Sequence, residues 1–134
     1  MLIKSETEML DFGQKLGAEL EAPAVLELLG DVGAGKTTLV RGIARGLGVQ
    51  AEVTSPSFTI SKEYQGEKYH LTHYDFYRLG DPGIMSEDLA EAISDPATIT
   101  IVEWGNSIQD ILPTSRKIIE IKYIDENTRE LIEK

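Results

Sequence analysis

The chain has 134 residues, no cysteine, and a formal net charge of −10 that comes from 13 basic and 23 acidic side chains. Its length fits one domain over residues 1–134, and a hydrophobic content of 41% is enough for a buried core. A surface this acidic repels phosphate backbones, which argues against unaided binding to nucleic acid. The lack of cysteine excludes disulfides, thiolate nucleophiles and cysteine-ligated zinc. No apolar run reaches the length of a membrane span, so we expect a cytoplasmic protein that does not contact a membrane.

The first third of the sequence predicts a helix, a buried strand and a second helix, in that order. Polar residues 5–8 can cap a helix in which apolar side chains recur at helical spacing up to Leu20. Residues 24–29 form an apolar run interrupted only by Glu27, which is typical of a strand buried on both faces. A glycine-rich loop separates this strand from a helix over residues 36–47.

The remainder of the sequence predicts more strands and one further helix. Residues 58–64 and 69–76 alternate polar and apolar side chains, which indicates a half-exposed β-hairpin. A short helix over residues 86–93 precedes an apolar strand over residues 99–102, and residues 116–123 form a last, alternating strand. Apolar strands separated by helices, together with a polar hairpin, predict a small α/β domain.

The segment GDVGAGKTT, residues 30–38, carries the clearest chemical signal. It matches G-x-x-x-x-G-K-[ST], with Gly30, Gly35, Lys36 and Thr37 at the fixed positions. Glycines let backbone N–H groups converge on phosphate oxygens, and the N-terminus of the following helix adds partial positive charge. Lys36 is expected to neutralise phosphate charge and the Thr37 hydroxyl to ligate Mg²⁺. We therefore expect a P-loop NTPase-like fold, with a central, largely parallel sheet, an antiparallel hairpin and flanking helices.

A P-loop site needs an acidic side chain to help hold the metal ion, and two carboxylates compete for this role. Glu103 ends an apolar, β-branched strand typical of the centre of a parallel sheet, where ligands gather at the carboxyl ends. Asp75 ends an alternating strand that we expect to be half-exposed. We therefore assign Glu103 to the metal, through a water molecule, rather than to a surface position. Asp75 is either the residue that orients the attacking water or a structural partner of Arg78.

Three further features have a structural and a functional interpretation. His73 is expected to be a hydrogen-bonded structural residue, and Trp104 is expected to pack in the core rather than to cover the site. The hydroxyl-rich segment before the predicted hairpin is either an ordinary turn or a switch that senses the γ-phosphate. That segment consists of Thr54, Ser55, Pro56, Ser57 and Phe58.

Four motifs follow one another along the chain: GDVGAGKTTLVRGIARGLG, VTSPSFTI, HYDFYRL and IVEWG. Together they resemble the TsaE family, the small bacterial ATPases of tRNA threonylcarbamoyladenosine synthesis, from about residue 6 to residue 113. The resemblance implies an ATPase that acts with the partner proteins TsaB and TsaD, which modify the adenosine beside the anticodon. The chain would then reach tRNA only through that complex, and its acidity suits docking onto proteins.

The resemblance also implies roles for single residues. Thr37 and Glu103 would be the Mg²⁺ ligands, Asp75 would be needed for activity, and residues 54–58 would act as a switch. Glu6 and Arg129 would contact the adenine or the ribose; the sequence ends at Lys134, soon after Arg129, so we expect an incomplete C-terminal wall for the base. The residues expected to bind ATP are Glu6, Gly30, Val32, Gly33, Ala34, Gly35, Lys36, Thr37, Thr38 and Arg129, and the expected catalytic residues are Lys36, Asp75 and Glu103.

The leading hypothesis is thus a Mg²⁺-dependent ATPase that is slow alone and stimulated by its partners. A small-molecule kinase is one alternative, but such enzymes need a lid with arginines. After residue 81 the sequence offers only scattered basic residues near its end: Arg116, Lys117, Lys122 and Arg129. The other alternative is an adaptor that senses nucleotide and hydrolyses nothing.

Overall fold

The computed structural model of the chain describes residues 1–31, 33–56, 60–77 and 83–134. Four residues singled out in the sequence, Val32, Ser57, Phe58 and Arg78, lie outside the described residues. Their predicted roles therefore stay predictions.

The described elements largely follow the expected order. They are β1 (Leu2–Ile3), α1 (Glu6–Glu19), β2 (Ala24–Leu29), α2 (Lys36–Gly46), β3 (Ser61–Gln65), β4 (His70–Asp75), α3 (Ile84–Ser94), β5 (Thr98–Glu103), the 3₁₀ helix η1 (Gly105–Ile108), β6 (Lys117–Tyr123) and β7 (Arg129–Glu133). The predicted helices and the strand β2 are confirmed. The prediction that β6 is the last strand is wrong, because β7 follows it. β7 carries charges at most positions and gains its strand structure from pairing with β6 and β1.

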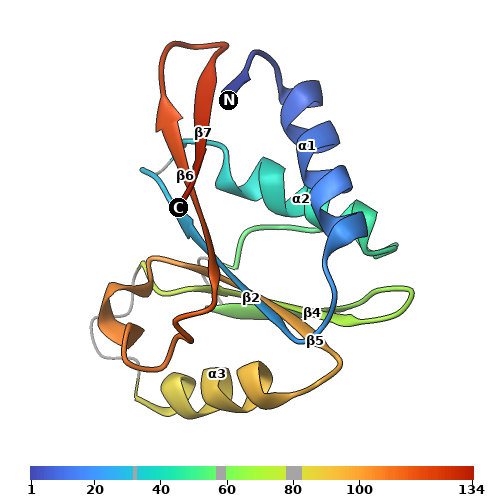
Figure 1. Cartoon of the computed structure of the whole chain (residues 1–134), viewed down its shortest axis with the longest axis vertical. Helices are drawn as coiled ribbons and strands as arrows, with labels where there is room; N and C mark the ends of the chain where they lie inside the picture. The colour runs from blue at the N-terminus through green and yellow to red at the C-terminus, as the bar shows by residue number, and fades with distance from the viewer. Residues whose placement is uncertain (32, 57–59, 78–82) are drawn as a thin grey trace.

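The described strands form one seven-stranded sheet in the order β1-β7-β6-β2-β5-β4-β3. β6, β2, β5 and β4 run parallel at its centre, β3 adds antiparallel to β4, and β7 and β1 add antiparallel at the other end. Helices α1 and α2 cover one face of the sheet, and α3 lies on the other (Figure 1). The predicted α/β fold, with a largely parallel central sheet, an antiparallel hairpin and flanking helices, is confirmed.

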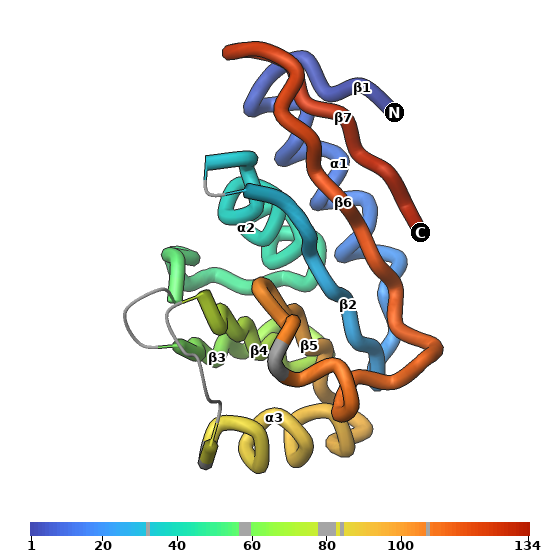
Figure 2. The backbone as a smooth tube through the Cα atoms, turned by 90° about the vertical axis from the view of Figure 1, so that its left-hand side faces the viewer, coloured from blue at the N-terminus to red at the C-terminus, as the bar shows by residue number. Residues whose placement is uncertain are grey.

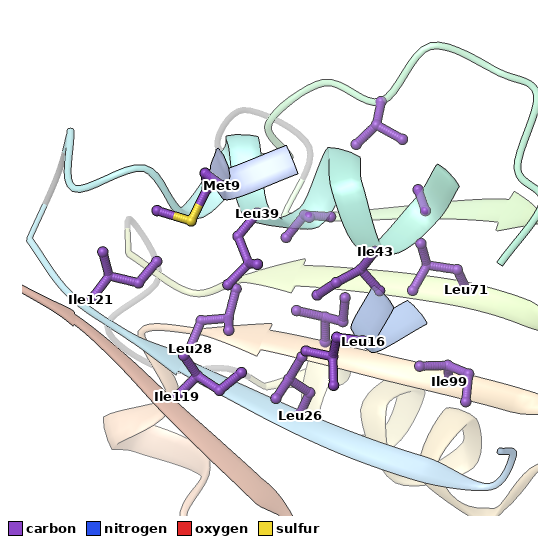
Figure 3. Close-up of a cluster of buried hydrophobic side chains, with 14 of the residues drawn as sticks. Met9, Leu16, Leu26, Leu28, Leu39, Ile43, Leu71, Ile99, Ile119 and Ile121 are labelled. Carbon is purple, nitrogen blue, oxygen red and sulfur yellow. The ribbon is translucent and has the colours of Figure 1, made fainter. Parts of the chain in front are cut away.

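The larger of the two hydrophobic clusters fills the space between the sheet and the helices α1 and α2. Leu39 and Ile43 of α2 point onto Leu26 and Leu28 of β2, with side chains of β4, β5 and β6 around them (Figure 3). Burial of these apolar side chains is the main favourable contribution to folding. Because the cluster packs directly beneath α2, it holds the first turn of α2 at the carboxyl end of β2.

Helices α1 and α2 approach each other at backbone contact. A Cβ atom at Gly17 would lie 2.2 Å from the Ile43 carbonyl oxygen, and one at Gly46 would lie 2.2 Å from the Gln14 carbonyl oxygen. Only glycine fits at such distances, since real Cβ atoms need more room. The close approach keeps the N-terminal part of α1 beside the loop that precedes α2, and the β6–β7 hairpin lies alongside α1 (Figure 2).

The strand β4 differs from the prediction of a half-exposed hairpin. All its residues after His70 are buried, whereas β3 at the sheet edge is mostly accessible. The reason is that β4 pairs in parallel with β5 and antiparallel with β3, so it lies inside the sheet with both of its faces covered. Polar side chains such as Thr72 and His73 gave β4 the alternating pattern of an exposed strand, but they are buried too.

Candidate functional site

The glycine-rich loop joins the central strand β2 to the helix α2, as the motif requires. Gly33 and Gly35 have φ angles of 83° and 109°, in the left-handed region that favours glycine, and Gly35 forms the N-cap of α2. These conformations turn the chain sharply, so that α2 begins directly after the loop. The N–H groups of its first turn therefore lie at the carboxyl edge of the parallel strands, where ligands gather.

Lys36 is the first residue of α2, and its ammonium group is held among polar and aromatic partners. Its Nζ donates a hydrogen bond of 2.6 Å to the Gly30 carbonyl and lies 3.8 Å from Glu103 Oε1. It also sits 4.1 Å from the centre of the Trp104 ring. Burial lowers the pKa of the Lys36 ammonium from its ordinary value, while the negative charges of Glu103 and Asp75 oppose this shift.

A hollow of about 410 Å³, which we call the Lys36 hollow, opens beside this ammonium group. It brings together side chains from the loop, α2 and the ends of β4 and β5, which are far apart in the sequence. Its lining consists of Gly33, Gly35, Lys36, Thr37, Thr38, Ser55, Asp75, Tyr77, Glu103 and Trp104. The expected catalytic residues Lys36, Asp75 and Glu103 thus meet in one hollow, together with Thr37.

Asp75 and Glu103, the two candidates for the metal-binding acid, lie side by side. They are register partners at the carboxyl ends of the parallel strands β4 and β5, and they are only 5% and 3% exposed. Glu103 Oε2 is hydrogen-bonded to Nε2 of His73. Asp75 Oδ1 accepts a hydrogen bond of 2.9 Å from the Tyr77 N–H. The expected position of Glu103 beside the loop is confirmed, and the expectation that Asp75 lies on a half-exposed strand is wrong because β4 is internal.

Two aromatic residues border the Lys36 hollow. Trp104 has a left-handed backbone with φ at 57°, which turns its ring back toward Lys36, and the Tyr77 ring lies 4.8 Å from it. Trp104 also packs against the hydrophobic cluster on the α3 side. The sequence favoured core packing for this residue, and that describes only part of its surroundings, because the ring also contacts Lys36. Tyr77 was not predicted as a site residue, although it lies two positions after Asp75 in the motif HYDFY; its side chain is 54% exposed.

A second hollow of about 410 Å³, the Arg129 hollow, lies on the side of the loop that faces α1 and β7. Its lining consists of Ile3, Lys4, Ser5, Glu6, Met9, Gly33, Ala34, Gly35, Thr38, Glu126, Asn127 and Arg129. Arg129 Nε donates a hydrogen bond of 3.0 Å to the Ala34 carbonyl, and its guanidinium lies 4.6 Å from the centre of the Tyr123 ring. Glu6 and Arg129, far apart in the sequence, thus border one hollow beside the loop. The sequence did not predict Met9 and Asn127 as lining residues, because methionine and asparagine side chains form no motif that indicates nucleotide binding.

The segment predicted as a switch is only partly brought to the site. Ser55 lines the Lys36 hollow, whereas Thr54 Oγ1 accepts a hydrogen bond from Lys62 of β3. The Pro56 carbonyl accepts a hydrogen bond of 2.6 Å from the Ile60 N–H, which leads the chain into β3. Ser57 and Phe58 belong to the part of the chain that the structure does not describe.

Within residues 1–31, 33–56, 60–77 and 83–134, no three or more His, Cys, Asp or Glu side chains gather in a way that would hold a metal ion. None of the helices described there has the length and apolar character needed to cross a bilayer.

The loop between the central parallel strand β2 and a helix, with buried acids at the ends of β5 beside it and of β4 next along, defines an α/β protein of P-loop-like fold. A family model described as "Threonylcarbamoyl adenosine biosynthesis protein TsaE" matches residues 3–131. The chain therefore belongs to the TsaE family, as its motifs suggested.

Individual relatives agree with this assignment. The chain is 36% identical over 129 residues to the tRNA threonylcarbamoyladenosine biosynthesis protein TsaE of Haemophilus influenzae, covering 92% of this chain and 82% of the relative. It is 43% identical over 119 residues to the protein of the same name from Bacillus subtilis, covering 87% and 73%. Among solved structures it is similar to the crystal structure of YdiB from Bacillus subtilis, with a TM-score of 0.81, 35% identity, and coverage of 98% of this chain and 80% of that one.

Proposed function

We propose that this chain is a Mg²⁺-dependent ATPase that supports the synthesis of threonylcarbamoyladenosine in tRNA together with TsaB and TsaD. The observation that carries the proposal is the convergence of Lys36, Thr37, Asp75 and Glu103 on one hollow beside the phosphate loop. The names of the relatives from Haemophilus influenzae and Bacillus subtilis support the biosynthetic role.

The nucleotide would lie across the loop, with its phosphates in the Lys36 hollow and its nucleoside in the Arg129 hollow. Gly33, Gly35 and Thr38 line both hollows, so the two spaces are adjacent at the loop. Loop N–H groups and Lys36 would bind the phosphates, and Glu6 and Arg129 would contact the adenine or ribose. Lys36 would exchange its contacts with Gly30 and Glu103 for contacts with phosphate oxygens.

The residues present fit a magnesium ion. Mg²⁺ prefers oxygen ligands, keeps several waters and usually takes only one or two protein ligands beside the substrate phosphates. A hydroxyl on Thr37 and a buried carboxylate on Glu103 are such a donor set, and both residues line the Lys36 hollow. When bound there, the ion would neutralise part of the negative charge that develops on the phosphates.

Asp75 would orient the attacking water. Its carboxylate is buried beside Glu103 and is fixed by the Tyr77 N–H, so it points from a rigid strand end rather than from a loop. A carboxylate held in this way can accept a proton or a hydrogen bond from water in the transition state. Residues 54–58 would sense the γ-phosphate, with Ser55 as the described residue that lines the hollow.

The net charge of −10 supports a function in which the chain does not bind tRNA by itself. An acidic protein would instead dock onto partner proteins, and those partners would carry the basic surface for RNA. We further propose that residues 1–134 form a single P-loop ATPase domain that acts in the cytoplasm.

The test is to titrate the purified chain with ATP and Mg²⁺ by calorimetry and then to measure phosphate release with and without TsaB and TsaD. We expect binding of ATP, slow turnover alone, and a marked increase with both partners. No increase at saturating partner concentrations would contradict the proposal. Transfer of labelled phosphate to a metabolite instead of water would support a kinase, and full tRNA modification by Glu103→Ala would support an adaptor without hydrolysis.

A further inference from the structure

His73 is a buried histidine for which the proposed function has no role so far. It lies in the middle of β4, its side chain is 0% exposed, and its Nε2 is hydrogen-bonded to Glu103 Oε2. The other ring nitrogen, Nδ1, has no hydrogen-bond partner in the part of the chain that the structure describes. Leaving a buried polar atom unpaired costs free energy, and an apolar side chain would avoid that cost. The contact that Nε2 makes with Glu103 is therefore the feature that distinguishes histidine from an apolar residue here.

The strand register explains how His73 reaches Glu103. On the parallel pair β4 and β5, Asp75 is opposite Glu103 and His73 is opposite Ile101. His73 and Asp75 are two positions apart on β4, so both side chains lie on the face of the sheet that carries Glu103. Glu103 therefore has an acidic neighbour directly opposite and a histidine on the diagonal.

The two oxygens of Glu103 have different surroundings. Oε2 is hydrogen-bonded to His73, whose side chain is fully buried, and Oε1 lies 3.8 Å from the Lys36 ammonium. The contact at 3.8 Å is longer than a hydrogen bond, so Lys36 attracts the carboxylate without fixing its rotation. Because Lys36 would turn toward the phosphates when ATP binds, His73 is the partner that would keep Glu103 in place.

We propose that His73 is a positioning residue for Glu103. Its Nε2–H holds Oε2 toward the interior of the sheet and thereby presents Oε1 to the loop, where the metal–nucleotide complex would bind. The inference rests on the proposed function, and it adds that the geometry of the acidic ligand is set by the histidine of the motif HYDFYR. Partners that orient a metal ligand in this way typically change metal affinity by about 10–100-fold when they are removed.

The experiment compares His73→Leu with His73→Gln, because glutamine carries an amide N–H near the position of Nε2. The probe is Mn²⁺, followed by electron paramagnetic resonance in the presence of ATP, and ATP affinity is also measured in EDTA without metal. His73→Leu should weaken Mn²⁺ binding about 10–100-fold and leave metal-free ATP affinity unchanged, and His73→Gln should recover most of the loss. His70→Leu is the matched control, since His70 is the other of the two histidines and is exposed on the same strand.

Several outcomes would overturn the inference. Unchanged Mn²⁺ affinity in His73→Leu would do so, and so would an equal loss of metal-free ATP affinity, which would show that the residue only supports the fold. If His73→Leu does not fold, the comparison is made between His73→Gln and His73→Asn, whose shorter amide does not reach Glu103; equal Mn²⁺ affinities would then overturn it. Absence of ATP binding by the unmodified chain would instead refute the proposed function itself.

Nitrogen-15 spectroscopy of the imidazole rings gives a readout that does not depend on bound metal. The chain has two histidines, so the two ring signals can be assigned with His70→Leu. We expect the buried ring to carry its proton on Nε2, because Nε2 must donate to the Glu103 carboxylate. A ring protonated only on Nδ1 would overturn the inference, since Nε2 would then have no proton to donate.

Discussion

Glu27 and Glu103 are buried carboxylates on the neighbouring parallel strands β2 and β5, and their surroundings differ. Glu27 is 2% exposed and Glu103 is 3% exposed. In the strand register Glu27 is opposite Val102, and Leu28 is opposite Glu103, so the two carboxylates lie on opposite faces of the sheet. Burial alone therefore does not distinguish them, and the difference lies in their partners.

Glu27 belongs to a closed network on the α3 side of the sheet. Its Oε1 accepts a hydrogen bond of 2.8 Å from Arg116 Nε, and its Oε2 accepts one of 2.8 Å from Gln109 Nε2. Arg116 also donates a hydrogen bond of 2.8 Å to Gln109 Oε1. Both of these partners belong to the connection between β5 and β6, so this carboxylate stabilises the path of that connection.

Among the described residues, Glu103 has one short contact, with His73, and one long one, with Lys36, and it lines a hollow. A carboxylate in this arrangement can accept a further ligand without breaking a closed network. The distances to the partners and the hollow beside the carboxylate, rather than burial, therefore separate a structural acid from a candidate ligand.

The largest effect is expected for Arg116→Met. Removing the guanidinium leaves the Glu27 charge buried without its main partner, which should lower the free energy of unfolding by about 3–5 kcal/mol. ATP affinity of the folded protein should not change, because Arg116 lies on the other face of the sheet from Glu103. Urea denaturation measures the first effect and calorimetry the second. Lys117→Met, at the exposed neighbouring position, is the control. A loss of stability of similar size in Lys117→Met would contradict the assignment of the effect to the contact between Arg116 and Glu27.

The second prediction concerns the acid beside Glu103. Asp75→Ala should lower ATP turnover by about 10²–10³-fold, since the water would lose the carboxylate that orients it. ATP affinity should change far less, and steady-state phosphate release combined with calorimetry separates the two quantities. Asp110→Ala, which removes an exposed carboxylate from the following segment, should behave like the unmodified chain. An equal loss of affinity and turnover in Asp75→Ala would make Asp75 a ligand of the metal or a part of the fold.

The third prediction concerns the cation that Glu103 faces. Lys36→Ala should weaken ATP binding by about 1.5–3 kcal/mol, the usual contribution of a hydrogen bond to a charged group, and should lower turnover as well. Calorimetric titration measures the binding loss. Lys15→Ala removes an exposed ammonium from α1 and should have no such effect. Unchanged binding and turnover in Lys36→Ala would exclude the loop from the mechanism.

Glu27 and Glu103 also show which features of the site can be predicted from the sequence and which cannot. The pattern around Lys36 predicts the loop because it depends on local backbone geometry, and the apolar strand before Glu103 predicts its position at a strand end. The partners of Glu27 are 82 and 89 residues away, so no local pattern reveals them. The alternating polar residues of β4 predict a half-exposed strand ending at Asp75, and the burial of Asp75 follows only from the pairing of β4 between β3 and β5.

The smallest effect is expected at Ser5, which combines a structural contact with a place in a hollow. Its Oγ accepts a hydrogen bond of 3.1 Å from the Glu8 N–H at the start of α1, and the residue also lines the Arg129 hollow. Ser5→Ala should therefore lower the free energy of unfolding by about 1 kcal/mol, the usual effect of losing an N-cap, and Ser5→Asp should retain the cap. If Ser5 resembles Glu27 in being structural, ATP affinity stays the same in both variants. A loss of affinity in Ser5→Ala without a loss of stability would place Ser5 with Glu103, among the residues that contact the ligand.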